Sequence, residues 1–458
     1  MNHPLTMIAI GVLAAAVASG QNRFTGATGE IRLMICDPGH FHAALVQKSM
    51  ADPIFPAVDV YAPEGPELED YLQRIKGFNT RADHPTSWNV RLHTGQDFLD
   101  RMVREKPGNV VVIAGNNRYK TEFIRSCVDA GLNVLSDKPM CIDRDGFAML
   151  EKAFESADKK RVLLYDIMTE RFEITNILQK ELVHLPGVFG RFQEGTPEHP
   201  AVIKESVHHF YKVVSGSPVR RPPWFFDIRQ QGEGIVDVTT HLVDLVQWGC
   251  FPGQVIRYPS DLSMRQARRW PSIISLEQFQ KATQLAGFPD FLKSRLSREG
   301  DLPVFSNGEM VYKIKGHWAK VSVQWNFEAP AGGGDTHFSV IRGSRCDAII
   351  RQGGEQNYRP ELYVEPAAGE DTIRFGEDLT AAIGKMNQQY PGLSLRHEGS
   401  AWHVLIPDSY RVGHEPHFGQ VANAYLEYLK EGKLPLWEVP NMLAKYYITT
   451  CALEMAER

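Results

Sequence analysis

The stretch Val110-Val-Val-Ile-Ala-Gly-Asn-Asn117 opens the segment that decides the fold. A helical pattern over Arg118–Ala130 follows it, and a second apolar run, Asn133–Ser136, ends in Asp137-Lys138-Pro139. An apolar run, a helix and another apolar run form a crossover unit, which joins two parallel strands of one sheet. The segment therefore predicts a parallel sheet with its polar strand ends at a common edge.

The same alternation extends along the chain in both directions. Further strands are predicted at Ile31–Cys36, Val58–Ala62, Asn109–Ala114 and Arg161–Tyr165, with helices at Phe41–Met50, Gln96–Glu105 and Asp143–Ser156. This pattern predicts an α/β Rossmann domain over residues 21–170, built on a doubly wound parallel sheet. Ligands of such sheets bind outside the carboxyl ends of the strands. Those ends are predicted at residues 37–42, 115–117, 136–139 and 166–171.

The first strand is followed by Asp37-Pro-Gly-His-Phe-His42, where a dinucleotide fold carries its G-x-G-x-x-G turn. Only the middle glycine, Gly39, is retained, at the position where the backbone must approach the pyrophosphate closely. Asp37 and His42 replace the outer two, and a carboxylate is unhelpful at a phosphate turn. Glu64, just past the second strand, is the candidate for binding the adenosine ribose, which modestly favours NAD over NADP.

A second motif begins at Gly232 and continues through Asp237, His241, Asp244 and Trp248. The spacing i, i+4, i+7, i+11 places the last four on one face of a helix. A carboxylate one turn from an imidazole would raise the pKa of His241 and orient it as a general base. The alternative is structural, with Asp237 capping the helix and His241 half-buried and hydrogen-bonded.

These motifs together resemble the Gfo/Idh/MocA family of oxidoreductases over roughly residues 30–260. The resemblance rests on Asp137-Lys138-Pro139 after the fifth strand, on Arg171-Phe172 after the sixth, and on the D-x-x-x-H pattern from Asp237 to His241. Asp137 stands where the family's E-K-P motif has glutamate, and the phosphate turn is degenerate. The resemblance implies that Lys138 is a catalytic or substrate-orienting lysine, that Asp237 is its acidic partner, and that His241 is the acid/base.

Cofactor-binding residues are expected at the strand ends. They are Gly39, His40, Phe41, Glu64, Asn116, Asn117, Asp137, Lys138 and Arg171, and they are expected to hold NAD or NADP. Taken alone, Asn116-Asn117 would be a helix cap.

Substrate contacts are expected from the strand Ser206–Lys212 and from the loop Ser217–Asp227. His209, Lys212 and Trp224 suit a sugar-like ligand, because an indole covers the apolar face of a pyranose while His and Lys bind its hydroxyls. The alternative is that these histidines are simply strand surface.

The second half of the chain predicts an α+β domain over 171–413, which the resemblance implies is an open, mainly antiparallel sheet. Strands are predicted at Gly187–Glu194, Glu309–Lys315, Trp318–Phe327, Thr336–Ile341, Asp347–Arg351 and Pro360–Val364. Residues 255–305 are expected to form a polar insertion with one helix at Leu276–Ala286. Helices at Phe375–Gln389, Gly419–Glu431 and Glu438–Glu457 follow, and residues 414–458 are expected to pack back on the core. His414 and His417 are interpreted as structural, and His337 has no assigned role.

The N-terminus differs from the rest of the 458-residue chain. The apolar run Leu5–Ala18 followed by Ala18-Ser19-Gly20 predicts a signal peptide over 1–20 and export, in a bacterium to the periplasm. The alternative is an uncleaved membrane anchor. No stable membrane insertion is expected after processing.

Composition narrows the classes of partner and site. A formal net charge of -5 gives no electrostatic reason to expect nucleic acid as a partner. The six cysteines are scattered singly, unlike a disulfide framework or a paired zinc site, so no obligatory metal site is expected.

The predicted function is an NAD(P)-dependent oxidoreductase that acts on a secondary alcohol of a sugar, glycoside or polyol. We expect the cofactor to be tightly bound, because free nicotinamide cofactor is not expected to be plentiful outside the cytoplasm. We also expect the protein to form a homo-oligomer. The first alternative is an NAD-dependent glycoside hydrolase or lyase that acts through transient oxidation. The second is a nucleotide-binding sensor without turnover, against which the retention of Lys138, Asp237 and His241 argues.

Overall fold

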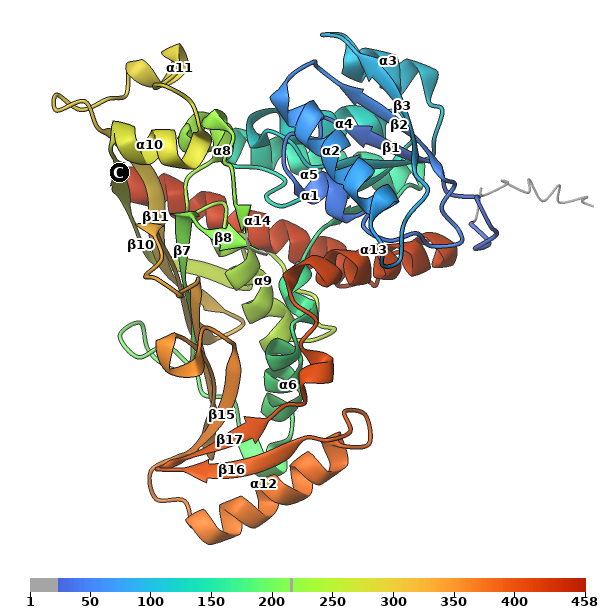
Figure 1. Ribbon diagram of the computed structural model, residues 1–458. Helices are drawn as coiled ribbons and strands as arrows, with labels where there is room; N and C mark the ends of the chain where they lie inside the picture. The colour runs from blue at the N-terminus through green and yellow to red at the C-terminus, as the bar shows by residue number, and fades with distance from the viewer. Residues whose placement is uncertain (1–23, 215–216) are drawn as a thin grey trace, which may run out of the picture.

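The computed structural model describes residues 24–214 and 217–458, so the predicted signal peptide lies outside the described residues. Two β-sheets organise the chain, one near the N-terminus and one larger sheet beside it (Figure 1). The C-terminal helices α13 (His414–Glu431) and α14 (Glu438–Glu457) run along the boundary between them.

The N-terminal sheet has six parallel strands in the order β3-β2-β1-β4-β5-β6. Its elements are β1 Leu33–Cys36, α1 His42–Leu45, β2 Ala57–Ala62, α2 Pro66–Thr80, β3 Asn89–Thr94, α3 Phe98–Glu105, β4 Val110–Ile113, α4 Asn117–Asp129, β5 Asn133–Ser136, α5 Arg144–Lys160 and β6 Leu164–Asp166. Every residue of β1 and β4 is buried, because helices cover both faces of the sheet. The strand order reverses between β1 and β4, which is the switch point where such sheets bind ligands. The predicted Rossmann fold is confirmed.

The second sheet has nine strands in the order β10-β11-β12-β7-β13-β14-β15-β17-β16. Only the pair β12 and β7 is parallel, so the predicted mainly antiparallel sheet is also confirmed. The strands are β7 Val202–Tyr211, β10 Leu262–Ile274, β11 Leu302–Ile314, β12 His317–Glu328, β13 Thr336–Arg342, β14 Cys346–Gln352, β15 Glu361–Pro366, β16 Ser394–Glu398 and β17 Ala401–Leu405, and a separate small hairpin pairs β8 Val213–Val214 with β9 Ser217–Pro218.

Helices and single turns connect these strands and close the chain. They are η1 Thr169–Phe172, α6 Ile174–Val183, α7 Pro186–Phe189, η2 Pro223–Phe226, α8 Ile228–Gln231, α9 Thr239–Cys250, α10 Leu276–Thr283, α11 Asp290–Lys293, η3 Gly354–Gln356, α12 Thr372–Met386, η4 Asp408–Tyr410, α13 His414–Glu431 and α14 Glu438–Glu457.

Two predictions about this region are wrong in detail. Gly187–Glu194 was expected to be a strand, but α7 occupies its first half, with Pro186 at the helix start where its fixed φ is favourable. The polar insertion at 255–305 contains β10, a 13-residue edge strand paired with β11. Most of β10 is partly or fully exposed, so it lacks the apolar alternation that marks a half-buried strand.

The C-terminal helices tie the two sheets together. Phe418 and Tyr425 of α13 join the apolar core of the N-terminal domain, and α14 contacts α5, α9 and β10. Lys445 of α14 is fully buried and binds Asp166 at 2.7 Å and Asp244 at 2.9 Å. The end of β6 and the helix α9 are therefore held by one buried ammonium group.

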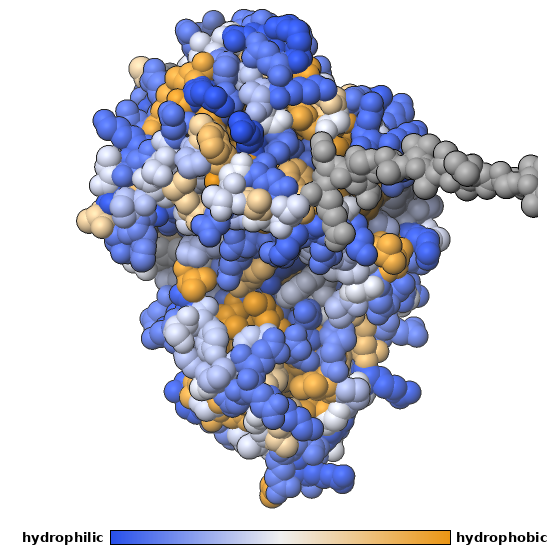
Figure 2. Space-filling view, turned by 90° about the vertical axis from the view of Figure 1, so that its right-hand side faces the viewer, coloured by the Kyte–Doolittle hydropathy of each residue, from blue (hydrophilic) through white to orange (hydrophobic). Residues whose placement is uncertain are grey.

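The surface is mixed in character. On the face drawn in Figure 2, hydrophilic side chains predominate and apolar ones gather in separate groups. None of the helices within 24–214 and 217–458 is both long and apolar enough to cross a membrane.

Candidate active site

The turn after β1 lies against the end of β4. His40 donates its backbone N–H to the Ala114 carbonyl at 2.8 Å, and a Cβ on Gly115 would lie 2.2 Å from the Asp37 carbonyl oxygen. Asp37 adopts a positive φ of 49°, and burial raises the pKa of its carboxyl group to about 6, although the backbone N–H of Asn116 lowers it. Only glycine at position 115 permits this close approach. Gly39 also faces this loop, since its Cβ would lie 3.4 Å from the Gly115 Cα.

Asn116 and Asn117 connect this edge of the sheet to the second domain. The Asn116 side chain accepts a bond from the Arg118 N–H, so it caps α4, and it donates to the Gln230 side chain at 2.8 Å. Asn117 donates to the Gln231 carbonyl at 2.7 Å. Both side chains thus hold α8 over the carboxyl ends of the strands.

Lys138 and Asp237 form an ion pair across the domain boundary. The Lys138 Nζ donates to Asp237 Oδ1 at 2.6 Å, and Gln231 donates to Asp237 Oδ2 at 2.9 Å. Both charged side chains are nearly buried. Asp237 is therefore the ion-pair partner of Lys138.

The predicted stacking of Asp237 beneath His241 is wrong. The helix α9 begins at Thr239, so Asp237 lies in the turn before it and its carboxylate points to Lys138 instead. Burial and the charge of Lys138 lower the pKa of His241 to about 3, which is opposite to the predicted rise. The Nδ1 atom of His241 is buried and has no hydrogen-bond partner within residues 24–214 and 217–458. The lowered pKa favours the neutral form of the imidazole.

Glu170 is a carboxylate that the sequence analysis did not single out. It follows β6 in η1 and lies 3.5 Å from the Nδ1 atom of His414. Burial alone would raise the pKa of Glu170, but His414 and His241 lower it well below its ordinary value. His417, one turn further along α13, is buried, and its Nδ1 atom has no hydrogen-bond partner among the described residues. The one available signal was that Glu170 immediately precedes Arg171 at a predicted strand end.

Arg171 does not point to a cofactor site. Its guanidinium donates twice to Asp244, both at 2.7 Å, and once to Glu438 at 2.7 Å. These bonds are buried and join η1 to α9 and α14. Since all three guanidinium nitrogens are used within the protein, the expected cofactor contact is replaced by a structural role.

The predicted substrate residues divide into two groups. His209 and Lys212 both contact Asp335, at 3.0 Å and 2.6 Å, and His208 lies 3.3 Å from the same carboxylate. Asp335 was not predicted, although it follows a triple glycine. Trp224 packs in an apolar cluster with neighbouring phenylalanines, so its indole is not offered as an open platform for a sugar.

The remaining predicted residues lie at the ends of β1, β2 and β5. Glu64 is exposed just beyond β2 and accepts a bond from Thr94. Phe41 lies beneath the guanidinium of Arg74. His40 and His42 both turn toward Asp137, which is buried.

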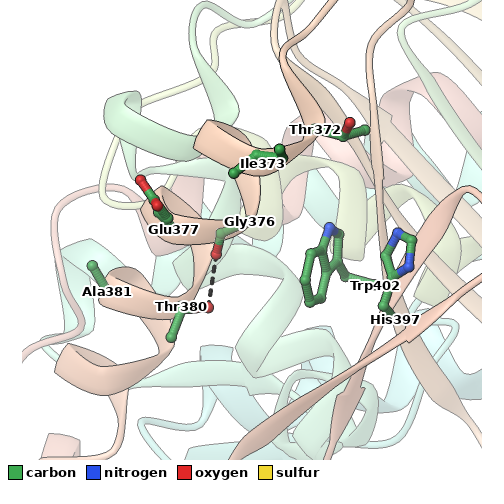
Figure 3. Close-up of a pocket in the computed structure, with 8 residues that line it drawn as sticks. All are labelled: Thr372, Ile373, Gly376, Glu377, Thr380, Ala381, His397 and Trp402. Atoms are coloured by element: carbon green, nitrogen blue, oxygen red, sulfur yellow. Dashed lines mark hydrogen bonds between the residues drawn. The ribbon is translucent and has the colours of Figure 1, made fainter.

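A separate groove lies between α12 and the β16–β17 hairpin. Figure 3 shows its wall, in which Trp402 faces the helix beside Gly376. In Figure 1 this helix is at the opposite end of the molecule from the N-terminal sheet. The groove therefore contributes nothing to the cluster around Lys138.

Comparison with known proteins shows the family to which this chain belongs. The family described as "Putative oxidoreductase C terminal domain" matches residues 178–457. The chain belongs to this family. It is also similar to a solved structure of a "putative oxidoreductase" from Parabacteroides merdae, with 56% identity over 95% of this chain and 99% of the other, and a TM-score of 0.93.

More distant solved structures share the fold of this oxidoreductase family member. Levoglucosan dehydrogenase in complex with NADH and levoglucosan has 13% identity, covers 93% of this chain and 97% of its own, and gives a TM-score of 0.59. GenD2 from gentamicin A biosynthesis in complex with NAD has 12% identity, covers 93% and 94%, and gives 0.55. No curated protein matches the chain.

Proposed function

We propose that the protein is an NAD(P)-dependent oxidoreductase that oxidises or reduces a secondary alcohol of a sugar, glycoside or polyol. The observation that carries the proposal is the ion pair between Lys138 and Asp237, which stands at the carboxyl edge of a Rossmann sheet beside a neutral His241. Such an edge is where these sheets bind dinucleotides. The similar folds of levoglucosan dehydrogenase and GenD2, solved with NADH and NAD, support the choice of cofactor and of substrate class.

The residues present fit a dinucleotide with one departure. Gly39 and Gly115 add no side chains of their own where the turn after β1 meets the end of β4, and Glu64 is exposed at the end of β2, where a carboxylate binds the ribose hydroxyls of NAD. Asn116 and Asn117 border the same edge. The departure is Asp37, whose carboxylate accepts a hydrogen bond from the backbone N–H of Asn116 at the start of α4. When bound, the nicotinamide supplies the hydride acceptor or donor.

The protein's own groups would position the alcohol and move its proton. The ammonium of Lys138 is oriented by Asp237, so it can donate a hydrogen bond to the substrate oxygen and stabilise negative charge there. His241, whose lowered pKa favours the neutral imidazole, is proposed to accept the proton of the alcohol as hydride leaves the carbon. His209 and Lys212, both anchored on Asp335, are proposed to bind other hydroxyls of the ligand.

The order of domains supports the same proposal. We propose residues 21–170 as the dinucleotide domain, 171–413 as the substrate and oligomerisation domain, and 414–458 as helices that close the cleft between them. Export through the segment 1–20, a tightly held cofactor and a homo-oligomeric state are parts of this proposal. A glycoside hydrolase or lyase that oxidises its substrate transiently would use the same residues and is the first alternative.

The test begins with the cofactor. Protein purified from its native compartment is denatured, and any released nucleotide is identified by mass spectrometry. Nucleotide-free protein is titrated with NAD, NADH, NADP and NADPH by calorimetry, and turnover is then measured on a panel of glycosides and polyols. Release or binding of a dinucleotide with turnover supports the proposal. An absence of binding to all four would contradict it, and binding without turnover would favour the sensor.

A further inference from the structure

Three side chains from two distant segments meet at the end of the N-terminal sheet. His40 and His42 flank Phe41 in the turn after β1, and Asp137 follows β5. The Nδ1 atom of His42 lies 3.0 Å from Asp137 Oδ2, and the Nδ1 atom of His40 lies 3.6 Å from the same oxygen. One ligand atom from each of the three residues can be chosen so that all lie within 4.8 Å of one another.

These separations match the coordination shell of a transition metal. Nitrogen and oxygen ligands about 2.0–2.2 Å from an ion stand about 3.0–3.6 Å apart when the angles at the ion lie between octahedral and tetrahedral values. The distances from Asp137 to His42 and to His40 fall at the ends of that range. The carboxylate and either imidazole are therefore spaced as two ligands of one ion, and all three groups lie within 4.8 Å of one another.

The Asp137 carboxylate is hydrogen-bonded to His42 and lies within electrostatic reach of the buried Lys120, which is not in direct contact with it. Asp137 is buried, and over residues 24–214 and 217–458 no Lys or Arg nitrogen lies within 4 Å of its carboxylate. Buried carboxylates are normally paired with a cation or bound to a metal. The Nδ1 atom of His40 is itself buried and finds no hydrogen-bond partner in the described part of the chain. One cation would satisfy both groups.

A second His–Asp contact in the same sheet shows the ordinary arrangement. His93 Nε2 lies 2.9 Å from Asp59, and the other oxygen of Asp59 is bound by Arg91. The guanidinium of Arg91 supplies the positive charge beside Asp59, whereas the imidazole of His40 lies beside Asp137 in place of an arginine. Asp137 therefore has two imidazoles next to its carboxylate, which is the set of ligands that a metal requires, and Asp59 has one.

We propose that His40, His42 and Asp137 form a binding site for one divalent transition-metal cation, with Zn²⁺ as the reference ion. Neutral imidazoles and a carboxylate are ligands that suit this class of ion, unlike Mg²⁺ or Ca²⁺, which prefer all-oxygen shells. Three protein ligands leave at least one coordination position open, as in catalytic rather than structural sites. The site adjoins Lys138 in the chain and includes His40 and Asp137, which are also among the residues expected to hold the dinucleotide, so metal binding is measured first without nucleotide.

The test measures metal binding by the full chain without a polyhistidine tag. Protein is stripped with EDTA, dialysed and titrated with Zn²⁺ by calorimetry, and the visible spectrum of bound Co²⁺ is recorded as a second readout. We expect about one equivalent per chain in the absence of NAD. Since the loss of an outer-shell partner already costs about 10–100-fold in metal affinity, His40→Ala should weaken Zn²⁺ binding at least that much.

Matched variants separate the site from the other histidines. His93→Ala should leave affinity and stoichiometry unchanged, because Asp59 lacks a second imidazole. His40→Asp restores a ligand and should recover most of the Zn²⁺ affinity lost in His40→Ala, with a changed Co²⁺ spectrum. His40 is the residue to vary first because its Nδ1 atom makes no hydrogen bond to any residue that the structure describes. No saturable binding by the wild type, or equal affinities for wild type and His40→Ala, would overturn the proposal.

Discussion

The Nζ atom of Lys138 lies 2.6 Å from Oδ1 of Asp237 and joins the end of β5 to the turn before α9. The two residues are 99 positions apart in the chain. A nearly buried pair of this kind fixes the direction of the ammonium group, which is what a group that must meet a substrate oxygen requires.

Lys138→Ala and His241→Ala should each lower turnover by roughly 100- to 10,000-fold, the usual contribution of a positioned proton-transfer or charge-stabilising group. Nucleotide binding, measured by calorimetry, should largely survive. Wild-type rates in folded His241→Ala would show that the chemistry lies elsewhere.

Asp237→Asn tests whether that residue acts through Lys138. The variant should lower turnover, and the double variant Lys138→Ala with Asp237→Asn should be little worse than Lys138→Ala alone, because residues that act as a unit are non-additive. The same cycle with His241→Ala should be closer to additive. If instead Asp237→Asn adds nothing to His241→Ala, the carboxylate serves the imidazole.

The pH dependence should follow the depressed pKa of His241. Its pKa is about 3 when folded and about 6.5 when unfolded, so on acidification the unfolded chain binds a proton first and the native state loses stability between these values. His241→Gln should lose less stability than wild type between pH 7 and pH 5 in urea denaturation. The pH profile of kcat/KM should lack a limb from His241 between pH 5 and 8. An acid limb near pH 6.5 that disappears in the variant would contradict this.

Asp244→Asn should destabilise the protein by about 3–5 kcal/mol, because it leaves Arg171 and Lys445 buried with less compensating charge. Burial would raise the pKa of Asp244, but Arg171 and Lys445 lower it well below its ordinary value. The stability it contributes is therefore present above the unfolded pKa of about 3.9 and is lost as pH falls below it. Asp290→Asn, at an exposed ion pair, is the control and should change stability by no more than about 0.5 kcal/mol.

Gly115→Ala should lower the melting temperature and weaken dinucleotide binding, because the new methyl group would overlap the Asp37 carbonyl. Gly384→Ala, on an open part of α12, should instead stabilise the helix by about 0.5–1 kcal/mol. Differential scanning calorimetry measures whether the melting temperature falls in Gly115→Ala and rises in Gly384→Ala. Unchanged melting and binding in Gly115→Ala would mean that the turn relaxes.

The mature chain should begin at or near Gln21 if the segment 1–20 is a signal peptide. Amino-terminal sequencing of protein from the native host measures this directly. An intact Met1 in the cytosolic fraction would contradict it.

The sequence by itself determined the alternation of strands and helices in the N-terminal domain and the edge at which its polar residues gather. The reason is that strands of a parallel sheet are buried on both faces and therefore consist of continuous apolar residues, as in Val110–Ile113. The sequence did not indicate β10, because an edge strand that is largely exposed to solvent has no such apolar run.

Only the tertiary structure decided which side chains meet. Three arrangements show this. Arg171 binds Asp244, Trp224 packs among phenylalanines, and His40 and His42 approach Asp137, and each of these contacts joins segments far apart in the chain. Local spacing fixes only which residues share a face of one element. The distance between two elements depends on how the whole core packs, and that information is spread over every residue that fills it.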